Sequence, residues 1–267
     1  MSHLSPARSM RAVTAACVLS ALPAAGLAQT ASPDQQQQAR GDWVIRLGAG
    51  FGVGPAYPGG RDYRVGPVPD VSITWRDTVF LDTGQGLGVT VINTPIIRLG
   101  ASVWMRGGRD EDDADRLRGL GDIDTAVQAR IFSRVALGPV DLGATLARDF
   151  GGSDGLTVNL NLSSTFRVTE RLRITPGIGT MIADDRYMAT WFGVSPAQSA
   201  RSGLPAFDAG AGFVSVGASL RAAYSLTQHW TLAAAVRVER LLGDAADSPI
   251  TERRTAPGAM FLVNYRF

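Results

Sequence analysis

The chain has 267 residues with a mean hydropathy of +0.05, and 45% of its residues are hydrophobic. This intermediate value is typical of membrane strands, which average lipid-facing and lumen-facing residues, and it argues against a bundle of transmembrane helices. The 26 basic residues are all arginine, and 24 residues are acidic. Residues 1–28 contain two of the arginines and no acid, so the remainder has zero net charge, which gives no reason to expect a nucleic-acid partner.

Residues 1–28 predict a secretory signal peptide that is cleaved on export. Arg8 and Arg11 form a positive segment, an apolar run follows over 12–22, and Ala28 is a small residue suited to the cleavage site. A transmembrane anchor needs about 20 apolar residues, and this run is shorter. The protein is therefore expected to leave the cytoplasm.

The single cysteine, Cys17, lies inside that apolar run, so no disulfide is expected in the exported protein. Residues 29–41 (QTASPDQQQQARG) are polar and low in complexity, and they predict a flexible periplasmic leader. The remaining residues, 42–267, are expected to form one folded domain.

Alternation with a period of two recurs through residues 42–267, in segments of about ten residues. In the segment 156–168, Val158 and its alternate neighbours are apolar, whereas Asn159 and Asn161 lie on the opposite face. A soluble β-sandwich also alternates, but here the polar face carries arginines in the middle of the strands. The pattern predicts an antiparallel transmembrane β-barrel.

Twelve strands are expected, with short turns at one end and longer external loops at the other. The segments 78–83 and 85–93 are the weakest pair, and if they form one bent element the number becomes ten. The expected strands cover residues 42–52, 65–76, 78–83, 85–93, 96–107, 122–133, 136–149, 155–167, 171–183, 212–226, 229–242 and 256–267. An even number leaves both ends of the chain in the periplasm.

The polar face is expected to line the lumen of the barrel. Its predicted members are Arg46, Arg98, Arg130, Asn159, Asn161, Arg167, Arg221, Arg237 and Glu239. Charges of both signs can pair across the interior and fill it, or they can line a narrow pore with anion preference. A barrel of twelve strands lies between filled small barrels and open porins, so the strand number does not choose between these two interpretations.

The last strand ends on a row of alternating apolar residues, Phe261, Val263, Tyr265 and Phe267. The row resembles the C-terminal signature that the barrel-assembly machinery recognises in outer-membrane proteins. A strand that closes a barrel must find its partner, because an open strand edge is not tolerated in lipid.

The residues that enzymes and metal sites require are scarce. The two histidines are His3, within the expected signal peptide, and His229, in an expected turn, so no catalytic triad can be assembled. The acidic run 110–115 lacks the glycine and final glutamate of a calcium loop, and the glycine-rich run 48–54 precedes no helix. We expect no cofactor, no metal site and no enzymatic activity.

Two segments of the expected external loops 184–211 and 243–255 are more specific than strand periodicity requires. The first, YMATWFGVSPAQSA, contains Tyr187, Phe192, Gly193, Val194 and Ser195. The second, RLLGDAADSPI, contains Gly243, Asp244, Asp247, Ser248 and Pro249. With the segments 57–69 and 117–123, they resemble the MipA/OmpV family, named for the MltA-interacting protein, over roughly residues 42–267.

The resemblance implies an outer-membrane barrel that acts as a scaffold between a lytic transglycosylase (MltA) and a penicillin-binding peptidoglycan synthase. A murein partner must be periplasmic, whereas the motifs lie in the expected external loops. Either these loops fold into the barrel as a plug, or the scaffold role uses the short turns and the leader. The surroundings are expected to be outer-membrane lipid and lipopolysaccharide, and the alternative function is a small arginine-lined passive pore.

Overall fold

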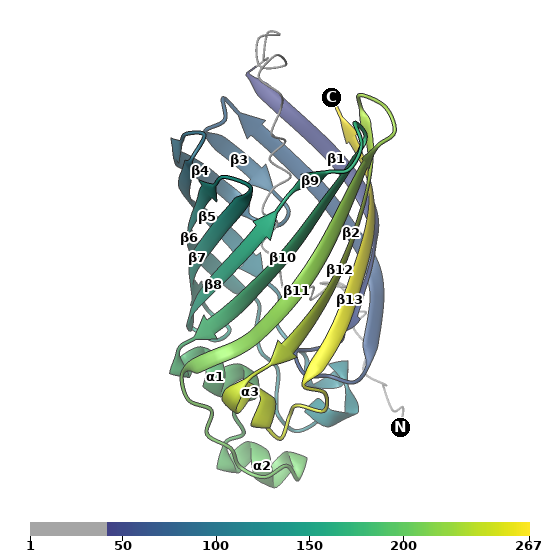
Figure 1. Cartoon of the computed structure of the whole chain (residues 1–267). Helices are drawn as coiled ribbons and strands as arrows, with labels where there is room; N and C mark the ends of the chain where they lie inside the picture. Colours follow the sequence, from purple (N-terminus) through teal and green to yellow (C-terminus); the bar gives the residue numbers. More distant parts are fainter. Residues whose placement is uncertain (1–41) are drawn as a thin grey trace, which may run out of the picture.

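The computed structural model describes residues 42–267, so the expected signal peptide 1–28 and leader 29–41 lie outside the described residues. Strands dominate this part of the chain, and they form a tall cylinder with helices gathered at one end (Figure 1). The strands are β1 (Trp43–Pro55), β2 (Tyr63–Trp75), β3 (Val79–Asp82), β4 (Gly86–Asn93), β5 (Ile97–Arg106), β6 (Ala126–Leu137), β7 (Val140–Phe150), β8 (Leu156–Ser164), β9 (Phe166–Arg167), β10 (Leu172–Ala183), β11 (Gly212–Ser225), β12 (Trp230–Leu241) and β13 (Thr255–Arg266).

Apart from β8 and β9, each strand pairs antiparallel with the next strand in sequence, and β13 returns to pair with β1. The segments β8 and β9 both pair with β10 and are two parts of one strand, so the wall has twelve strands. The predicted antiparallel barrel and the number twelve are confirmed, and the alternative of ten strands is wrong. The pair 78–83 and 85–93 forms a separate hairpin, β3–β4.

One predicted turn is wrong. The expected strands 122–133 and 136–149 leave a turn between them at 134–135, but β6 continues to Leu137 and the chain reverses at Gly138 and Pro139. Gly138 has φ of 66°, a left-handed conformation that glycine adopts without steric cost. Arg134, inside β6, points inward and pairs with Asp141 at 2.9 Å, so its polarity indicates the lumen and not a turn.

The helices lie at the end of the barrel opposite the chain's C-terminus, which we call the loop end; the other end is the turn end (Figure 1). The helical elements are η2 (Glu111–Asp113), η3 (Asp115–Leu117), α1 (Asp185–Phe192), α2 (Pro196–Ser202) and α3 (Gly243–Asp247). No helix within residues 42–267 is both long enough and apolar enough to cross a bilayer.

The outer surface of the wall is apolar over its middle. Val91, Ile131 and Ile178 are each more than half exposed, as are Val236 and Phe51. In water, so many exposed apolar side chains on one surface would drive aggregation. In a bilayer they contact the apolar acyl chains of the lipid. At the turn end, aromatic pairs follow one another around the rim, such as Trp43 with Trp75 at 6.3 Å and Trp230 with Tyr265 at 4.9 Å.

The closing strand pair, β1 with β13, is packed so closely that β1 needs glycine. A Cβ atom added at Gly50 would lie 1.7 Å from the carbonyl oxygen of Phe261, and one at Gly48 would lie 1.7 Å from Oδ1 of Asn264. The glycine-rich run 48–54 therefore serves strand packing. The C-terminal row of Phe261, Val263, Tyr265 and Phe267 lies on this last strand and just beyond it, where the cylinder closes.

Candidate functional site: a polar lumen beneath a folded cap

The polar faces of the strands point into the cylinder, because their side chains meet across strands that are not neighbours. Arg46 on β1 lies 3.7 Å from Asp70 on β2 and 3.9 Å from Asp82 on β3. Arg98 on β5 contacts the ring of Phe80 on β3, and Phe132 on β6 packs against that ring at 5.7 Å. Contacts of this kind are geometrically available only from the inner face of a curved sheet.

The remaining predicted lumen residues also lie on the inner register of their strands. Asn159 and Asn161 share a face on β8, and a Cβ added at Gly143 opposite would meet the amide of Asn161 at 2.3 Å. Arg237 and Glu239 on β12 pair at 3.4 Å. Arg167 stands opposite Arg173 near the turn end, and Arg221 stands opposite Thr175.

The most deeply buried charged group of the lumen is Asp149, which is 1% exposed. Its carboxylate accepts hydrogen bonds from Nε2 of Gln128 at 2.7 Å and from Oγ of Ser153 at 2.6 Å, and Nε of Arg106 lies 3.6 Å away. A buried carboxylate is tolerated when it is paired and hydrogen-bonded in this way. These groups therefore brace the wall between β5, β6 and β7.

A second arginine, Arg130 on β6, lies beside this cluster. It donates to Oε1 of Gln128 and, through Nη1, to the carbonyl oxygen of Gly84 at 3.0 Å. Its guanidinium stands 4.0 Å from the centre of the Trp104 ring, a cation–π contact. Sequence periodicity placed Arg130 on the inner face, but it gave no sign of Trp104 or Gln128 as its partners.

Four loops, comprising residues 56–62, 107–125, 184–211 and 242–254, pack together at the loop end and form what we call the cap. One buried cluster joins α1 and α3 to the ends of β10–β12, and includes Met188, Phe192 and Leu241. A second joins the other loops through Tyr57 and Leu117. Phe207 packs against both clusters. The cap is thus a small apolar core of its own, seated over the lumen.

The motif residues are parts of this cap. Tyr187 and Phe192 are buried on α1, and Gly193 ends that helix by donating to the carbonyl oxygens of Met188 and Ala189. Val194 exchanges two backbone hydrogen bonds with Phe207. Ser195 caps the start of α2 in a reciprocal capping box with Gln198.

The second motif holds the third helix against the first. Oγ of Ser248 donates to the carbonyl oxygen of Phe192 at 2.6 Å, and Oδ2 of Asp244 accepts from the amide of Gly210 at 2.9 Å. Gly243 starts α3 with φ of 49°. Asp247 pairs with Arg254 at 2.7 Å, and the carbonyl oxygen of Pro249 accepts from Nε of Arg116 at 2.9 Å. These positions fix the geometry of the loops.

Arg109 and Tyr57 are among the titratable groups of the cap whose pKa values are shifted. Burial lowers the pKa of Arg109 to about 10; its Nη1 donates to the carbonyl oxygen of Trp191 at 3.1 Å. Burial, followed by a hydrogen bond to Glu252 at 3.0 Å, raises the pKa of Tyr57 well above its ordinary value. Arg109 is charged and Tyr57 neutral at physiological pH, so both hold the loops together as hydrogen-bond donors.

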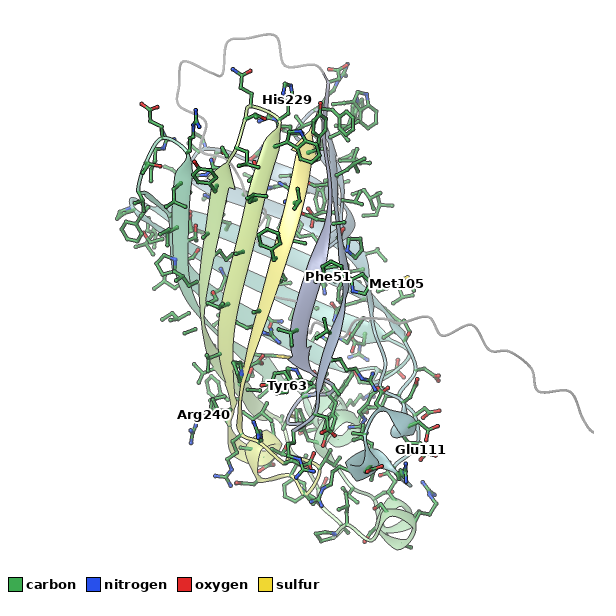
Figure 2. All side chains as sticks on the ribbon, turned by 90° about the vertical axis from the view of Figure 1, so that its right-hand side faces the viewer. Phe51, Tyr63, Met105, Glu111, His229 and Arg240 are labelled. Atoms are coloured by element: carbon green, nitrogen blue, oxygen red, sulfur yellow. The ribbon has the colours of Figure 1, made fainter. Side chains whose placement is uncertain are left out.

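Acidic side chains of the run 110–115 accept hydrogen bonds that stabilise the local turns of the loop. Oε2 of Glu111 accepts from the amides of Gly119 and Gly121 at 3.0 Å each, and Asp110 and Asp113 form a capping box around η2. Within residues 42–267 no group of three or more histidine, cysteine or acidic residues is arranged to hold a metal ion. His229 stacks on Tyr265 at the turn end, far from this run (Figure 2).

The chain matches the family described as MltA-interacting protein MipA over residues 47–267. The MltA-interacting protein of Escherichia coli (strain K12) is 26% identical over 234 residues, which cover 86% of this chain and 92% of that protein. YiaT of the same strain, whose name refers to the outer membrane, is 31% identical over 97 residues, which cover 36% of this chain and 39% of YiaT.

Solved structures with a similar course of the chain include the NanC porin, with a TM-score of 0.48 and 6% identity over 84% of this chain and 100% of that one. The KdgM porin has a TM-score of 0.38 and 8% identity over 84% and 99%. The family resemblance carried by the loop motifs is confirmed by the match over residues 47–267. This chain is a twelve-stranded outer-membrane β-barrel and belongs to the family of the MltA-interacting protein MipA.

Proposed function

We propose that the protein is a structural barrel whose periplasmic end associates with peptidoglycan-remodelling enzymes, and that it has no catalytic activity of its own. The partners proposed are a lytic transglycosylase and a penicillin-binding peptidoglycan synthase. The name of the MltA-interacting protein, similar over 86% of this chain, supports the first of them. Residues 1–28 are proposed to direct export, and the barrel-assembly machinery is proposed to insert residues 42–267.

The observation that carries this proposal is the packed cap. Phe192, Tyr57 and Leu117 are at most 1% exposed, so the loops form a compact core over one mouth of the barrel. Many of the charged side chains beneath the cap form ion pairs with one another, such as Arg106–Asp149 and Arg237–Glu239. A covered mouth above a lumen of paired charges favours a structural barrel over an open pore.

The turn end is the surface that a periplasmic partner would meet. An even strand number places both ends of the described chain at this end, and short turns are periplasmic in outer-membrane barrels. At the loop end, the exposed Arg240 on β12 points outward (Figure 2), where it can pair with phosphates of lipopolysaccharide. The motif-bearing cap therefore faces outward, and the enzymes are assigned to the turns.

Two measurements on the full-length folded protein test the proposal. In planar bilayers we expect no steady single-channel openings. Steady openings whose ion selectivity changes on Arg130→Glu would establish the alternative, an arginine-lined passive pore. In capture experiments with a purified lytic transglycosylase or peptidoglycan synthase, we expect the folded barrel to retain the enzyme.

The end of the barrel is identified by matched charge reversals. Arg171 lies exposed in the turn between β9 and β10, and Arg186 lies exposed on α1 in the cap. Arg171→Glu is expected to weaken capture, because a reversed charge at the rim of an interface slows association, whereas Arg186→Glu leaves capture unchanged. If only Arg186→Glu abolished capture, the partner would bind the loop end, which contradicts the proposal.

A further inference from the structure

The barrel wall is incomplete between β2 and β5. β2 has 13 residues and β5 has ten, but the hairpin between them contributes only four residues in β3 and eight in β4 (Figure 1). β3 pairs with β2 only over Ser72–Trp75, and β4 pairs with β5 only over Arg98–Val103. Toward the loop end, no strand within residues 42–267 pairs with the facing edges of β2 and β5.

The direction of the free backbone groups follows from the last bonds of the hairpin. The amide of Val71 donates to Oγ1 of Thr83, and the amide of Thr83 donates to the carbonyl oxygen of Val71. Backbone groups of alternate residues point to the same side of an antiparallel strand. The residues of β2 that share the parity of Val71 therefore direct their backbone groups into the opening.

Those residues are Tyr63, Val65, Pro67 and Pro69. Two of the four are proline, which has no N–H group and is confined to edge strands when it occurs in a sheet. The prolines remove two donors that would otherwise be unpaired, and they prevent another strand from adding to this edge. The sequence of β2 is thus suited to a permanent opening.

The tip of the hairpin ends inside the membrane. Four residues of β3 rise about 13 Å along the strand, roughly half of the apolar band of about 25 Å. A turn at that depth is stable only if its polar groups are bonded. Oδ1 of Asp82 accepts from the amides of Gly84 and Gln85 at 2.9 and 3.2 Å, and Nε1 of Trp104 donates to the carbonyl oxygen of Thr83 at 2.9 Å.

The cap bounds the opening at the loop end of the barrel. Nη2 of Arg64 on β2 lies 2.7 Å from Oδ1 of Asp113 and donates to the carbonyl oxygen of Asp113, so the loop that leaves β5 is bound to β2. The result is a window, bounded by β2, β5, the hairpin tip and this loop. On the β2 border of the window, Val65 is 73% exposed. On the β5 border, Met105 is 67% exposed and points away from the barrel (Figure 2). Acyl chains of the outer leaflet surround a window at this height.

A positive charge lies directly behind the window. Arg130 reaches the hairpin tip through Gly84, and within residues 42–267 its hydrogen bonds and ring contact are with Gly84, Gln128 and Trp104, which carry no charge. Asp149 attracts it and Arg106 repels it, both without a direct contact. The nearby carboxylate of Asp149 already faces Arg106. An arginine at membrane depth whose nearest carboxylate is shared with a second arginine and makes no direct contact with it favours an anionic ligand.

We propose that this window admits an anionic, single-chain amphiphile from the outer leaflet. Its acyl chain lies between β2 and β5 against Val65 and Met105, and its anionic group enters the lumen and pairs with Arg130 above the Trp104 ring. Because the cap covers the loop end, a molecule in the membrane reaches the lumen through this window in the wall.

The first test uses Trp104 as a reporter of acyl chains. A protein in which Trp43, Trp75, Trp191 and Trp230 are replaced by phenylalanine is folded in phosphatidylcholine vesicles, with and without lipid brominated in mid-chain. Bromine quenches tryptophan on contact, so Trp104 fluorescence is expected to fall although its side chain lies on the inner face. An otherwise Trp-free control with Thr145→Trp, on the inner face of the complete wall at β7, is expected to keep its fluorescence. Equal quenching at the two positions, or none at either, would overturn the window.

The second test concerns the charge of the ligand. Dibromostearate is titrated against its methyl ester, which is uncharged, and each is followed by quenching of Trp104. Half-maximal quenching is expected at an about tenfold lower concentration for the acid, as one charge-assisted hydrogen bond provides. Arg130→Gln should remove this difference and Arg130→Lys should retain it, with folding of each variant checked by gel migration. A difference that persists in Arg130→Gln, or that is absent in the parent protein, would overturn the assignment to an anionic amphiphile.

Discussion

Val236→Arg is expected to prevent assembly of the barrel. Val236 lies in the middle of β12 and is 54% exposed on the outer face, so the arginine would stand in the apolar band of the membrane. A charge near the midplane on the lipid face costs about 2–4 kcal/mol. Folding yield into vesicles, read as the fraction of protein with folded gel migration, measures the effect.

Neighbouring positions on β8 provide the matched control. Val158→Arg is expected to behave like Val236→Arg, because Val158 shares the outer face with Leu160 and Leu162. Asn159→Arg places the same side chain on the inner face and is expected to change the folding yield little. Equal losses at 158 and 159 would show that the facing of the strand is incorrect.

Phe192→Ala is expected to open the cap without unfolding the wall. Phe192 is fully buried at the end of α1 and belongs to the cluster that joins α1 and α3 to β10–β12. Removal of a buried phenylalanine side chain costs about 3–5 kcal/mol, which a small core of loops cannot absorb. Limited proteolysis of the folded protein should then cleave within 184–211, while the strands stay protected.

The control for this cap variant is Phe213→Ala. Phe213 lies at the loop end of β11 but is 55% exposed on the outer surface, so its removal leaves the cap core intact. We expect proteolysis of Phe213→Ala to match that of the unaltered protein. If Phe192→Ala is cleaved no faster than Phe213→Ala, the loops are not held by the packing described.

Periodicity predicted the strands because the wall obeys a local rule, in which neighbouring residues face opposite solvents. It failed where that rule was overridden by turn chemistry. Ser133 and Arg134 suggested a break, whereas the turn is built by Gly138 and Pro139, and the polar residues belong to the inner face of β6. Likewise β1 extends to Pro55 because Gly52 and Gly54 still pair with β2.

The contacts of the lumen could not be predicted in the same way. Alternation assigns Arg130 to the inner face, but its meeting with Trp104 and Gly84 depends on the stagger of β5, β6 and the hairpin. The stagger of a barrel is a global property of its closure. The short β3 was visible in the sequence as a weak strand, and Pro67 and Pro69 were the available sign that β2 has a free edge.

The cap lay beyond any local pattern, since its clusters join residues as distant as Tyr57 and Ile250. The only sign of the cap in the sequence was that the two loop motifs are more specific than strand periodicity requires. Asp244 and Ser248 now have structural roles, as acceptor for Gly210 and donor to Phe192. Residues that determine loop geometry and residues that bind a partner look alike in a single sequence.

Gel migration of isolated outer membranes, with and without boiling, tests the central claim most directly. A β-barrel stays folded in dodecyl sulfate at room temperature because the backbone groups of its strands are largely paired with neighbouring strands around the ring. The protein is expected in the membrane fraction, as a band that shifts to a different apparent mass after boiling. A protein recovered from the soluble periplasm without detergent, with one migration before and after boiling, would contradict a membrane-embedded cylinder.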